Sequence, residues 1–101
     1  MSEETERAFQ IDETVPMKAE IKVAGTLHDP TESILVTLWD KDGTVVFTDQ
    51  AATKEATGKY VYFWNPTTGA KKGEYVYRYF TQDGSGAGAK KTIVYKTFTL
   101  Q

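Results

Sequence analysis

The sequence predicts an all-β domain in which two sheets pack face to face. Apolar side chains recur at every second position along several segments, which is the period of a half-buried strand. The 101 residues include six Tyr, five Phe and two Trp, and aromatic residues favour strands. Groups of Gly, Pro, Asp and Asn separate these segments at short intervals, as in sandwiches and barrels. A chain of this length forms one domain with a modest core.

The N-terminal segment is expected to lie outside that domain. Residues 1–8 are polar and have no apolar period to offset the entropy of ordering them, so we expect a disordered tail. The domain is then expected to span residues 9–101. The sequence of this span contains no internal repeat and no sign of a second domain.

Two strands are expected at the start of the domain. Phe9, Ile11 and Val15 predict a short first strand that Pro16 interrupts, because proline is confined to strand edges and strand starts. The next strand is predicted from its alternation. Its apolar face consists of Met17, Ala19, Ile21 and Val23. Residues 25–32 follow as a turn-rich link.

The next elements are a hairpin and a loop. Residues 33–40 and 44–48 are predicted strands, and Asp42 and Gly43 between them predict a tight turn in which both residues adopt positive φ. Residues 49–58 are polar and alanine-rich, and they are too short and too weakly periodic for a core helix. We expect an edge loop there, with a single helical turn as the alternative.

Three more strands complete a predicted set of seven. Residues 59–65 and 74–82 are aromatic strands joined by a loop at 66–73, and residues 91–100 form the last strand. Residues 83–89 are rich in glycine and predict a flexible connector. Seven short strands with this spacing of turns are typical of a β-sandwich.

A short motif makes the predicted sandwich more specific. Residues 73–77, Gly-Glu-Tyr-Val-Tyr, match the start of the strand in immunoglobulin-like domains where a tyrosine hydrogen-bonds back to a loop. Tyr75 would be this corner tyrosine. Tyr77 would stand where an antibody domain has its cysteine, so an apolar ring would replace the disulfide in the core. We expect both residues to have structural roles.

Longer segments carry a narrower resemblance. They are residues 34–46, 56–64, 73–77 and 96–100. Together they resemble immunoglobulin-like modules of tailed-phage and provirus structural proteins, and are similar to the N-terminal domain of phage baseplate upper proteins. Secreted bacterial immunoglobulin-like repeats share these patterns, and Trp39 before Asp40 departs from them. The resemblance implies a seven-stranded immunoglobulin-like β-sandwich that forms part of a virion or tail assembled in the cytoplasm.

Composition argues against several classes of partner. The net charge of −2 and pI near 5.3 do not provide the positive field that nucleic-acid binding needs. The absence of cysteine excludes disulfides and thiolate sites. The acidic N-terminus lacks the features of a secretory signal, and no stretch approaches the roughly 18 apolar residues of a spanning helix. We therefore expect cytoplasmic synthesis, with no nucleic-acid or membrane partner.

Three of the predicted strands would present apolar side chains on one outward face. Residues 33–40, 74–82 and 91–100 would be neighbours in an immunoglobulin sheet, and alternate residues of each point outward. The outward set is Leu35, Trp39, Val76, Arg78, Phe80, Ile93 and Tyr95, here called the outer patch. Exposed apolar patches mark interaction surfaces, and Trp, Tyr and Arg are enriched at interface hot spots. The sequence predicts a protein-binding or self-association surface, unless residues 49–58 or the N-terminal segment fold over it.

Residues capable of chemistry are sparse. His28 is the only histidine, and neither Ser33 nor Ser85 lies in the Gly-x-Ser-x-Gly elbow of a serine hydrolase. One metal site is conceivable, a calcium ion held by loop aspartates at one end of the sandwich. These aspartates are Asp29, Asp40, Asp42 and Asp83. We expect no catalytic residues, no cofactor and no metal, and hence no enzyme.

Two functions remain open from the sequence. The leading hypothesis is a structural or assembly module of a phage or provirus particle that docks through the outer patch. The alternative is a spacer, or a carbohydrate- or protein-binding domain, from a secreted or cell-surface protein. In that case Tyr60, Tyr62 or Trp64 would stack on sugars, although their spacing fits a packed strand equally well.

Overall fold

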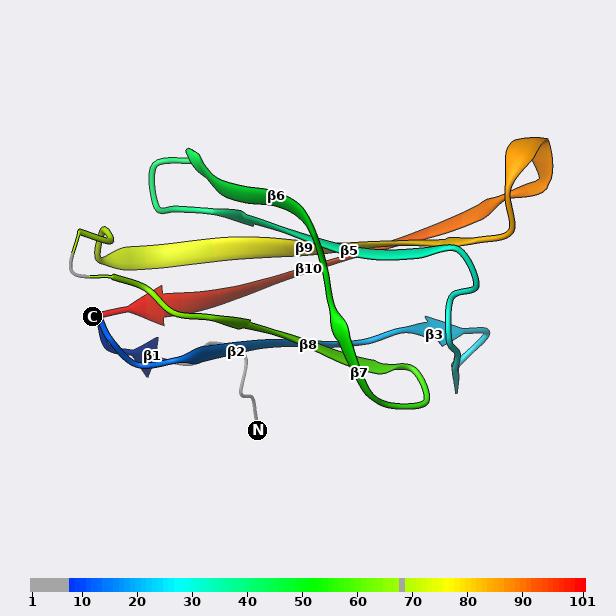
Figure 1. The fold of residues 1–101 in the computed structure, drawn as a ribbon, viewed down its shortest axis with the longest axis horizontal. Helices are drawn as coiled ribbons and strands as arrows, with labels where there is room; N and C mark the ends of the chain where they lie inside the picture. The colour runs from blue at the N-terminus through cyan, green and yellow to red at the C-terminus, as the bar shows by residue number, and fades with distance from the viewer. Residues whose placement is uncertain (1–7, 68) are drawn as a thin grey trace.

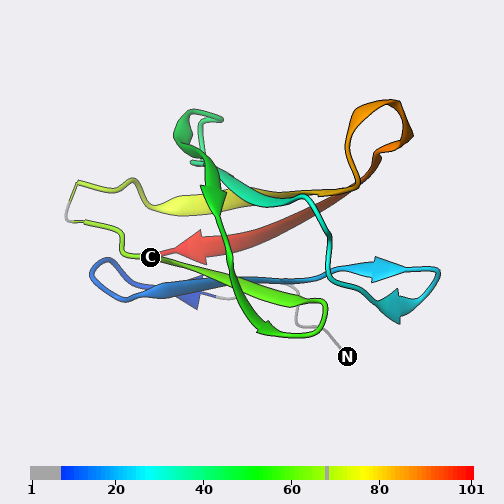
Figure 2. The same cartoon turned by 45° about the vertical axis from the view of Figure 1, so that its right-hand side comes forward.

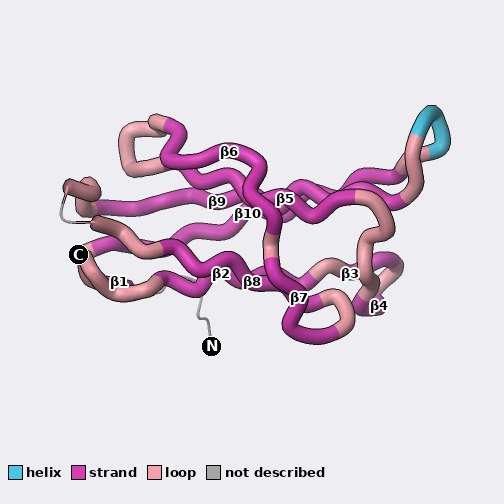
Figure 3. The backbone as a smooth tube through the Cα atoms, viewed as in Figure 1, coloured by secondary structure: helices cyan, strands magenta, loops and turns pink. Residues whose placement is uncertain are grey.

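The computed structural model describes residues 8–67 and 69–101, and they form strands joined by turns (Figure 1). The one helical segment in this part of the chain is a single 3-10 turn at Gly86–Gly88, in the predicted connector (Figure 3). Residues 1–7 of the predicted tail lie outside the described residues. The first strand begins at Ala8, one residue earlier than expected, because Ala8 pairs with Thr99.

The larger sheet has five strands in the order β1-β10-β9-β5-β6. In that order they are β1 (Ala8–Phe9), β10 (Lys90–Leu100), β9 (Gly73–Asp83), β5 (Ser33–Trp39) and β6 (Val45–Ala51). The short β1 runs parallel to β10, and every other neighbouring pair is antiparallel. The register of β10, β9 and β5 is continuous, so side chains on these three strands stand in straight rows.

The smaller sheet has three antiparallel strands in the order β2-β8-β7. They are β2 (Val15–Glu20), β8 (Lys59–Trp64) and β7 (Thr53–Ala56). A separate hairpin of β3 (Lys22–Val23) and β4 (Thr26–Leu27) extends from the end of β2. Figures 1 and 2 show the two sheets as facing layers, with the chain passing between them from β6 to β7. The predicted all-β class is confirmed, and the layers are consistent with a β-sandwich.

The core lies between the two layers and is built from alternate residues of both. Period-two alternation places one face of β2, β5, β9 and β10 against the opposite sheet, as the sequence predicts. The buried cluster consists of Phe9, Val15, Met17, Ala19, Ile21, Val36, Leu38, Tyr60, Tyr75, Tyr77, Tyr79, Phe98 and Leu100. Aromatic rings dominate its centre, where Tyr75 stacks on Phe98 with ring centroids 5.2 Å apart.

Two tyrosines of β9 connect the layers by hydrogen bonds as well as by packing. The hydroxyl of Tyr77 donates to the carbonyl oxygen of Lys18 at 2.8 Å, and that of Tyr79 donates to the carbonyl oxygen of Met17 at 2.6 Å. Both acceptors belong to β2 of the smaller sheet. A buried phenol needs such a partner, so each ring supplies apolar area and a satisfied polar end together.

The start of the domain differs from the prediction in two ways. Val23 is 47% exposed rather than buried. The reason is that Ala24 and Gly25 adopt positive φ and turn the chain back, so that β3 leaves the sheet and pairs with β4. Pro16 lies within β2 and does not interrupt it, because β2 is an edge strand that tolerates a missing N–H.

The predicted edge loop at 49–58 is wrong. Strand β6 extends to Ala51, and β7 begins at Thr53 after the single residue Ala52. All four residues of β7 are exposed, so this edge strand shows no apolar alternation in the sequence. The segment runs to the smaller sheet and pairs with β8.

The predicted hairpin turn has a different geometry. Gly43 has positive φ, but Asp42 does not, which excludes a turn with two left-handed central residues. The Asp40 carboxylate accepts hydrogen bonds from the N–H groups of Asp42 and Thr44, at 2.8 and 3.0 Å. This side chain therefore fixes the turn from within.

We expect Tyr79→Phe to destabilise the protein by about 1–2 kcal/mol, because it removes a buried hydrogen bond and leaves the carbonyl of Met17 without that donor. The free energy of unfolding from urea titration measures the change. Tyr95→Phe is the matched control, since the same atom is removed at an exposed ring. Equal stability of the two variants would contradict the assigned role of the bond.

We also expect the protein to lose stability at high pH. Burial raises the pKa of Tyr77 from 10.0 to about 12, and burial raises the pKa of Tyr79 too. A raised pKa means that folding favours the protonated phenol. The stabilising contribution of this phenol to the free energy of unfolding is therefore complete below pH 10 and is lost as the pH rises to about 12. Urea titrations across this range should show a smaller decline for Tyr77→Phe than for the wild type, and parallel declines would refute the assignment.

Candidate interaction surface

The structure gathers all seven residues of the predicted outer patch on one face of the larger sheet. Across β10, β9 and β5 the paired residues form three rows. The rows are Ile93–Phe80–Leu35, Tyr95–Arg78–Thr37 and Thr97–Val76–Trp39. The inward neighbours of these residues on β5 and β9 are buried in the core, so the predicted direction of the side chains agrees with their burial.

The patch is open at one side and half-buried at the other. Ile93 is 50% exposed and Tyr95 is 61% exposed, both on β10. The other five members are half-buried by their neighbours on the face. Among the described residues, the segment 49–58 does not cover the patch, because it forms the end of β6 and then β7 of the other sheet.

Arg78 lies at the centre of the patch and contacts the Trp39 ring. Its guanidinium carbon is 5.4 Å from the centre of the Trp39 ring, within the range of a cation–π contact. The Trp39 and Tyr95 ring centroids are 6.5 Å apart. The Nε of Arg78 is buried and has no hydrogen-bond partner among the described residues. A buried donor without a hydrogen-bond partner is uncommon in folded proteins and requires an explanation.

A local irregularity in β6 shapes one margin of the patch. Thr37 is almost fully buried on the outward face, beside Arg78. Its hydroxyl accepts from the N–H of Asp49 at 3.0 Å and lies 3.3 Å from the carboxylate of the same residue. Asp49 has positive φ, and the β5–β6 register shifts nearby. The side chain of Thr37 therefore stabilises a bulge in the edge strand.

Sequence reasoning missed one member of this surface. Val45 of β6 pairs with Trp39 and is 49% exposed, so the apolar area continues past Trp39 to the edge strand. A shallow depression of about 400 Å³ lies beside it. Its lining consists of Trp39, Asp40, Lys41, Gly43, Glu74, Val76 and Tyr95. The alternation of β6 was visible, but its register against β5 was not.

The four aspartates of the conceivable calcium site do not come together. Asp29 and Asp83 lie near the start of β5, whereas Asp40 and Asp42 follow its end. A seven-residue strand separates the two pairs by roughly 20 Å. Among the described residues, no group of three or more His, Cys, Asp or Glu side chains is placed to hold a metal ion.

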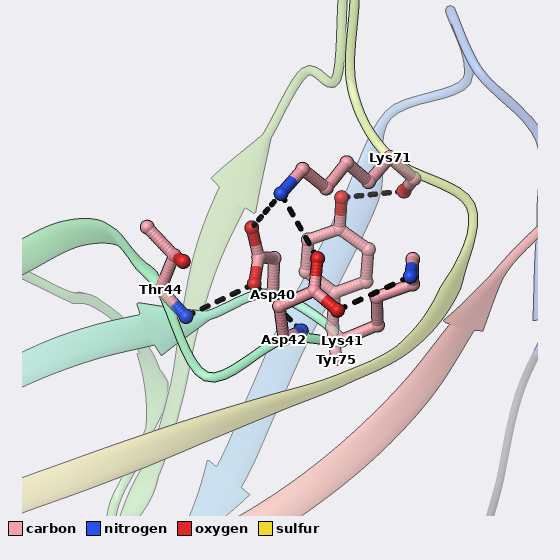
Figure 4. Close-up of polar contacts among 6 residues, drawn as sticks. All are labelled: Asp40, Lys41, Asp42, Thr44, Lys71 and Tyr75. Atoms are coloured by element: carbon pink, nitrogen blue, oxygen red, sulfur yellow. Dashed lines mark hydrogen bonds and ion pairs between the residues drawn. The ribbon is translucent and has the colours of Figure 1, made fainter.

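Each aspartate pair instead stabilises a loop. Lys71 reaches Asp42 at 2.9 Å and Asp40 at 3.8 Å, and the hydroxyl of Tyr75 donates to the carbonyl of Lys71 at 2.6 Å (Figure 4). The hydrogen bond from Lys71 and that from Lys41 hold the pKa of Asp42 below its usual value. These contacts join the β5–β6 turn to the loop before β9.

At the other end, Asp29 accepts hydrogen bonds from the N–H of Gly58, from the Lys54 ammonium and from the Tyr60 hydroxyl, at 2.7 to 2.8 Å. The Gly58 bond, followed by those of Lys54 and Tyr60, holds the pKa of Asp29 far below its usual value. His28 lies 2.8 Å from Asp83 and lowers the pKa of that carboxyl. The only histidine is thus paired with a carboxylate that also caps a turn at Thr31.

The rings proposed for sugar stacking face the core. Tyr60 is buried, and Tyr62 and Trp64 pack against the core cluster. The ring of Tyr62 lies 4.8 Å from that of Phe47, and the ring of Trp64 lies 5.3 Å from that of Tyr75. None of the three forms an exposed platform, which removes the observation that pointed to a carbohydrate.

In the described part of the chain, no helix is long and apolar enough to cross a membrane. Comparisons with protein-family models, with curated proteins and with solved structures found no match to this chain.

We expect Arg78→Met to leave the free energy of unfolding within about 1 kcal/mol of the wild type. The change removes an unpaired buried donor whose desolvation costs about 1–3 kcal/mol and a cation–π contact worth about 0.5–1 kcal/mol. The unbranched Met side chain still covers the strand. Urea titration measures the outcome, and a loss above about 2 kcal/mol would show that the guanidinium has a stabilising partner in the folded chain.

Proposed function

We propose that this chain is a non-enzymatic structural or assembly module that binds a protein partner through the outer patch. The observation that carries the proposal is the continuous aromatic and apolar face around Arg78 on β10, β9 and β5. Large rings beside an arginine are the residues that contribute most at protein interfaces. Mixed polar loops with structural hydrogen bonds account for the aspartates and for His28.

We further propose that the sandwich is immunoglobulin-like. In that fold one sheet has the strand order C′-C-F-G and the other contains B, E and D. The order β6-β5-β9-β10 in one sheet and β2-β8-β7 in the other fits this pattern, with β2 as B and β10 as G. The bond from the Tyr75 hydroxyl back to Lys71 supports the corner role of Tyr75, and the burial of Tyr77 supports its place in the core.

The proposed setting is a phage or provirus particle. It rests on the resemblance of residues 34–46, 56–64, 73–77 and 96–100 to modules of tailed-phage structural proteins. Fold alone does not fix function, so the gene context provides the discriminating observation. Neighbouring capsid or tail genes favour this setting, whereas flanking repeats favour a spacer or binding domain of a secreted or cell-surface protein.

The docking face can be tested with peptides selected from a random displayed library on the immobilised wild-type protein. We expect the double variant Trp39→Ala/Tyr95→Glu to bind the selected peptides with an affinity at least tenfold lower than that of the wild type. A tenfold change is about 1.4 kcal/mol of binding free energy. Fluorescence polarisation with the synthetic peptides measures the affinities.

Phe63→Ala is the matched control, because Phe63 is an exposed aromatic residue on β8 of the smaller sheet. Circular dichroism should show both variants folded. If the double variant binds every selected peptide as well as the wild type does, the outer patch is not the docking face.

A further inference from the structure

The geometry points to a partner that presents a carboxylate, flanked by apolar side chains, to Arg78. This inference rests on the proposed docking function and names the chemistry of the group that the patch receives. Its starting point is an arginine placed at the middle of a face that consists mainly of apolar side chains.

The guanidinium of Arg78 has unused hydrogen-bonding capacity. A guanidinium presents five N–H donors in a planar fork that matches a carboxylate. Among the described residues, no carboxylate forms an ion pair with it, and its Nε has no hydrogen-bond partner. Asp49, two strands away across the sheet, is engaged by Thr37 instead.

The surroundings of Arg78 strengthen any such contact. The Trp39 ring lies under the guanidinium. On the same face of β9, the half-buried Val76 precedes Arg78 and the half-buried Phe80 follows it. A charged hydrogen bond that is shielded from water by apolar neighbours is stronger than one on an open surface. The same neighbours provide apolar contacts for the residues on either side of the partner's carboxylate.

A second copy of the chain does not supply this group. A two-fold axis through the centre of the patch brings Arg78 of one copy against Arg78 of the other, which places like charges together in an apolar interface. The carboxylate of Glu74 on the same face is four residues away along β9, about 13 Å at the rise of a strand. Pairing Glu74 with Arg78 would move the axis from Arg78 to Val76, away from the centre of the patch.

A nucleic acid is also a poor occupant. The chain carries a net charge of −2, and the residues paired with Arg78 across the sheet, Tyr95 and Thr37, are uncharged. Backbone phosphates are bound by several Lys and Arg side chains together. A single guanidinium framed by Trp39 and Tyr95 fits one acidic side chain of a protein segment.

The test uses small probes that differ only in charge. Phenylacetate carries a carboxylate and an apolar ring, and phenylacetamide is its neutral match. We expect phenylacetate to shift the NMR signals of the Arg78 Nε–H and the Trp39 indole N–H in a saturable titration. Its dissociation constant should be about tenfold lower than that of the amide, because a charged hydrogen bond is formed.

Variants assign the effect to the side chain. Arg78→Gln should abolish the preference for phenylacetate over phenylacetamide, whereas Lys96→Gln, which removes an exposed charge from β10, should preserve it. The dispersion of the amide spectrum shows whether each variant is folded. Equal binding of the two probes, or an unchanged preference in Arg78→Gln, would overturn the inference.

Other outcomes would also overturn it. Inorganic phosphate that shifts the same signals more strongly than phenylacetate would assign the site to phosphate groups. A dimer detected by light scattering and broken by Trp39→Ala/Tyr95→Glu would place a second copy on the patch. If selected peptides need Trp39 and Tyr95 but bind Arg78→Gln normally, this inference fails while the docking function stands. If the peptides ignore the patch, the docking function itself fails.

Discussion

The structure depends on the tyrosines of β9 that reach across to the backbone of β2. Each ring fills the space between the sheets, and the hydroxyls of Tyr77 and Tyr79 satisfy carbonyl groups of the opposite layer. These bonds and the packing of the rings together hold β9 against β2 across the interior. Because side chains alternate along a strand, committing Tyr75, Tyr77 and Tyr79 to the core commits the residues between them to the outer surface. The outer patch is therefore a geometric consequence of the core.

Alternation explains how much of the molecule could be predicted. It located the main strands and the inward and outward sides of β5, β9 and β10, and adjacency of these strands then assembled the patch. It failed where both sides of a strand are exposed, as in β7, and where a turn ends the pairing, as at Ala24 and Gly25 next to Val23. Alternation also does not predict the register of β6 against β5, because this register depends on the bulge opposite Thr37. Val45 was missed for that reason.

The position of Arg78 illustrates how stability and recognition diverge. An unpaired guanidinium among aromatic rings adds little to folding, since its Nε loses water without gaining a partner. In an interface, however, the same group discriminates between partners, because a segment without a carboxylate leaves the charge buried and unpaired. An apolar face alone would bind any hydrophobic surface of suitable shape. In the proposed interface, the charge at its centre would restrict which surfaces fit.

The bend in β6 limits how this protein meets others. A straight, unpaired strand at the margin of a sheet is a template on which strands of other molecules can add and aggregate. Here the left-handed residue Asp49 and the transfer of the chain to the smaller sheet at Ala52 interrupt that margin after a few residues. Charged side chains on β7, Lys54 and Glu55, continue the protection. Indefinite addition of strands along this margin is thereby disfavoured, although the margin borders the apolar residues of the outer patch.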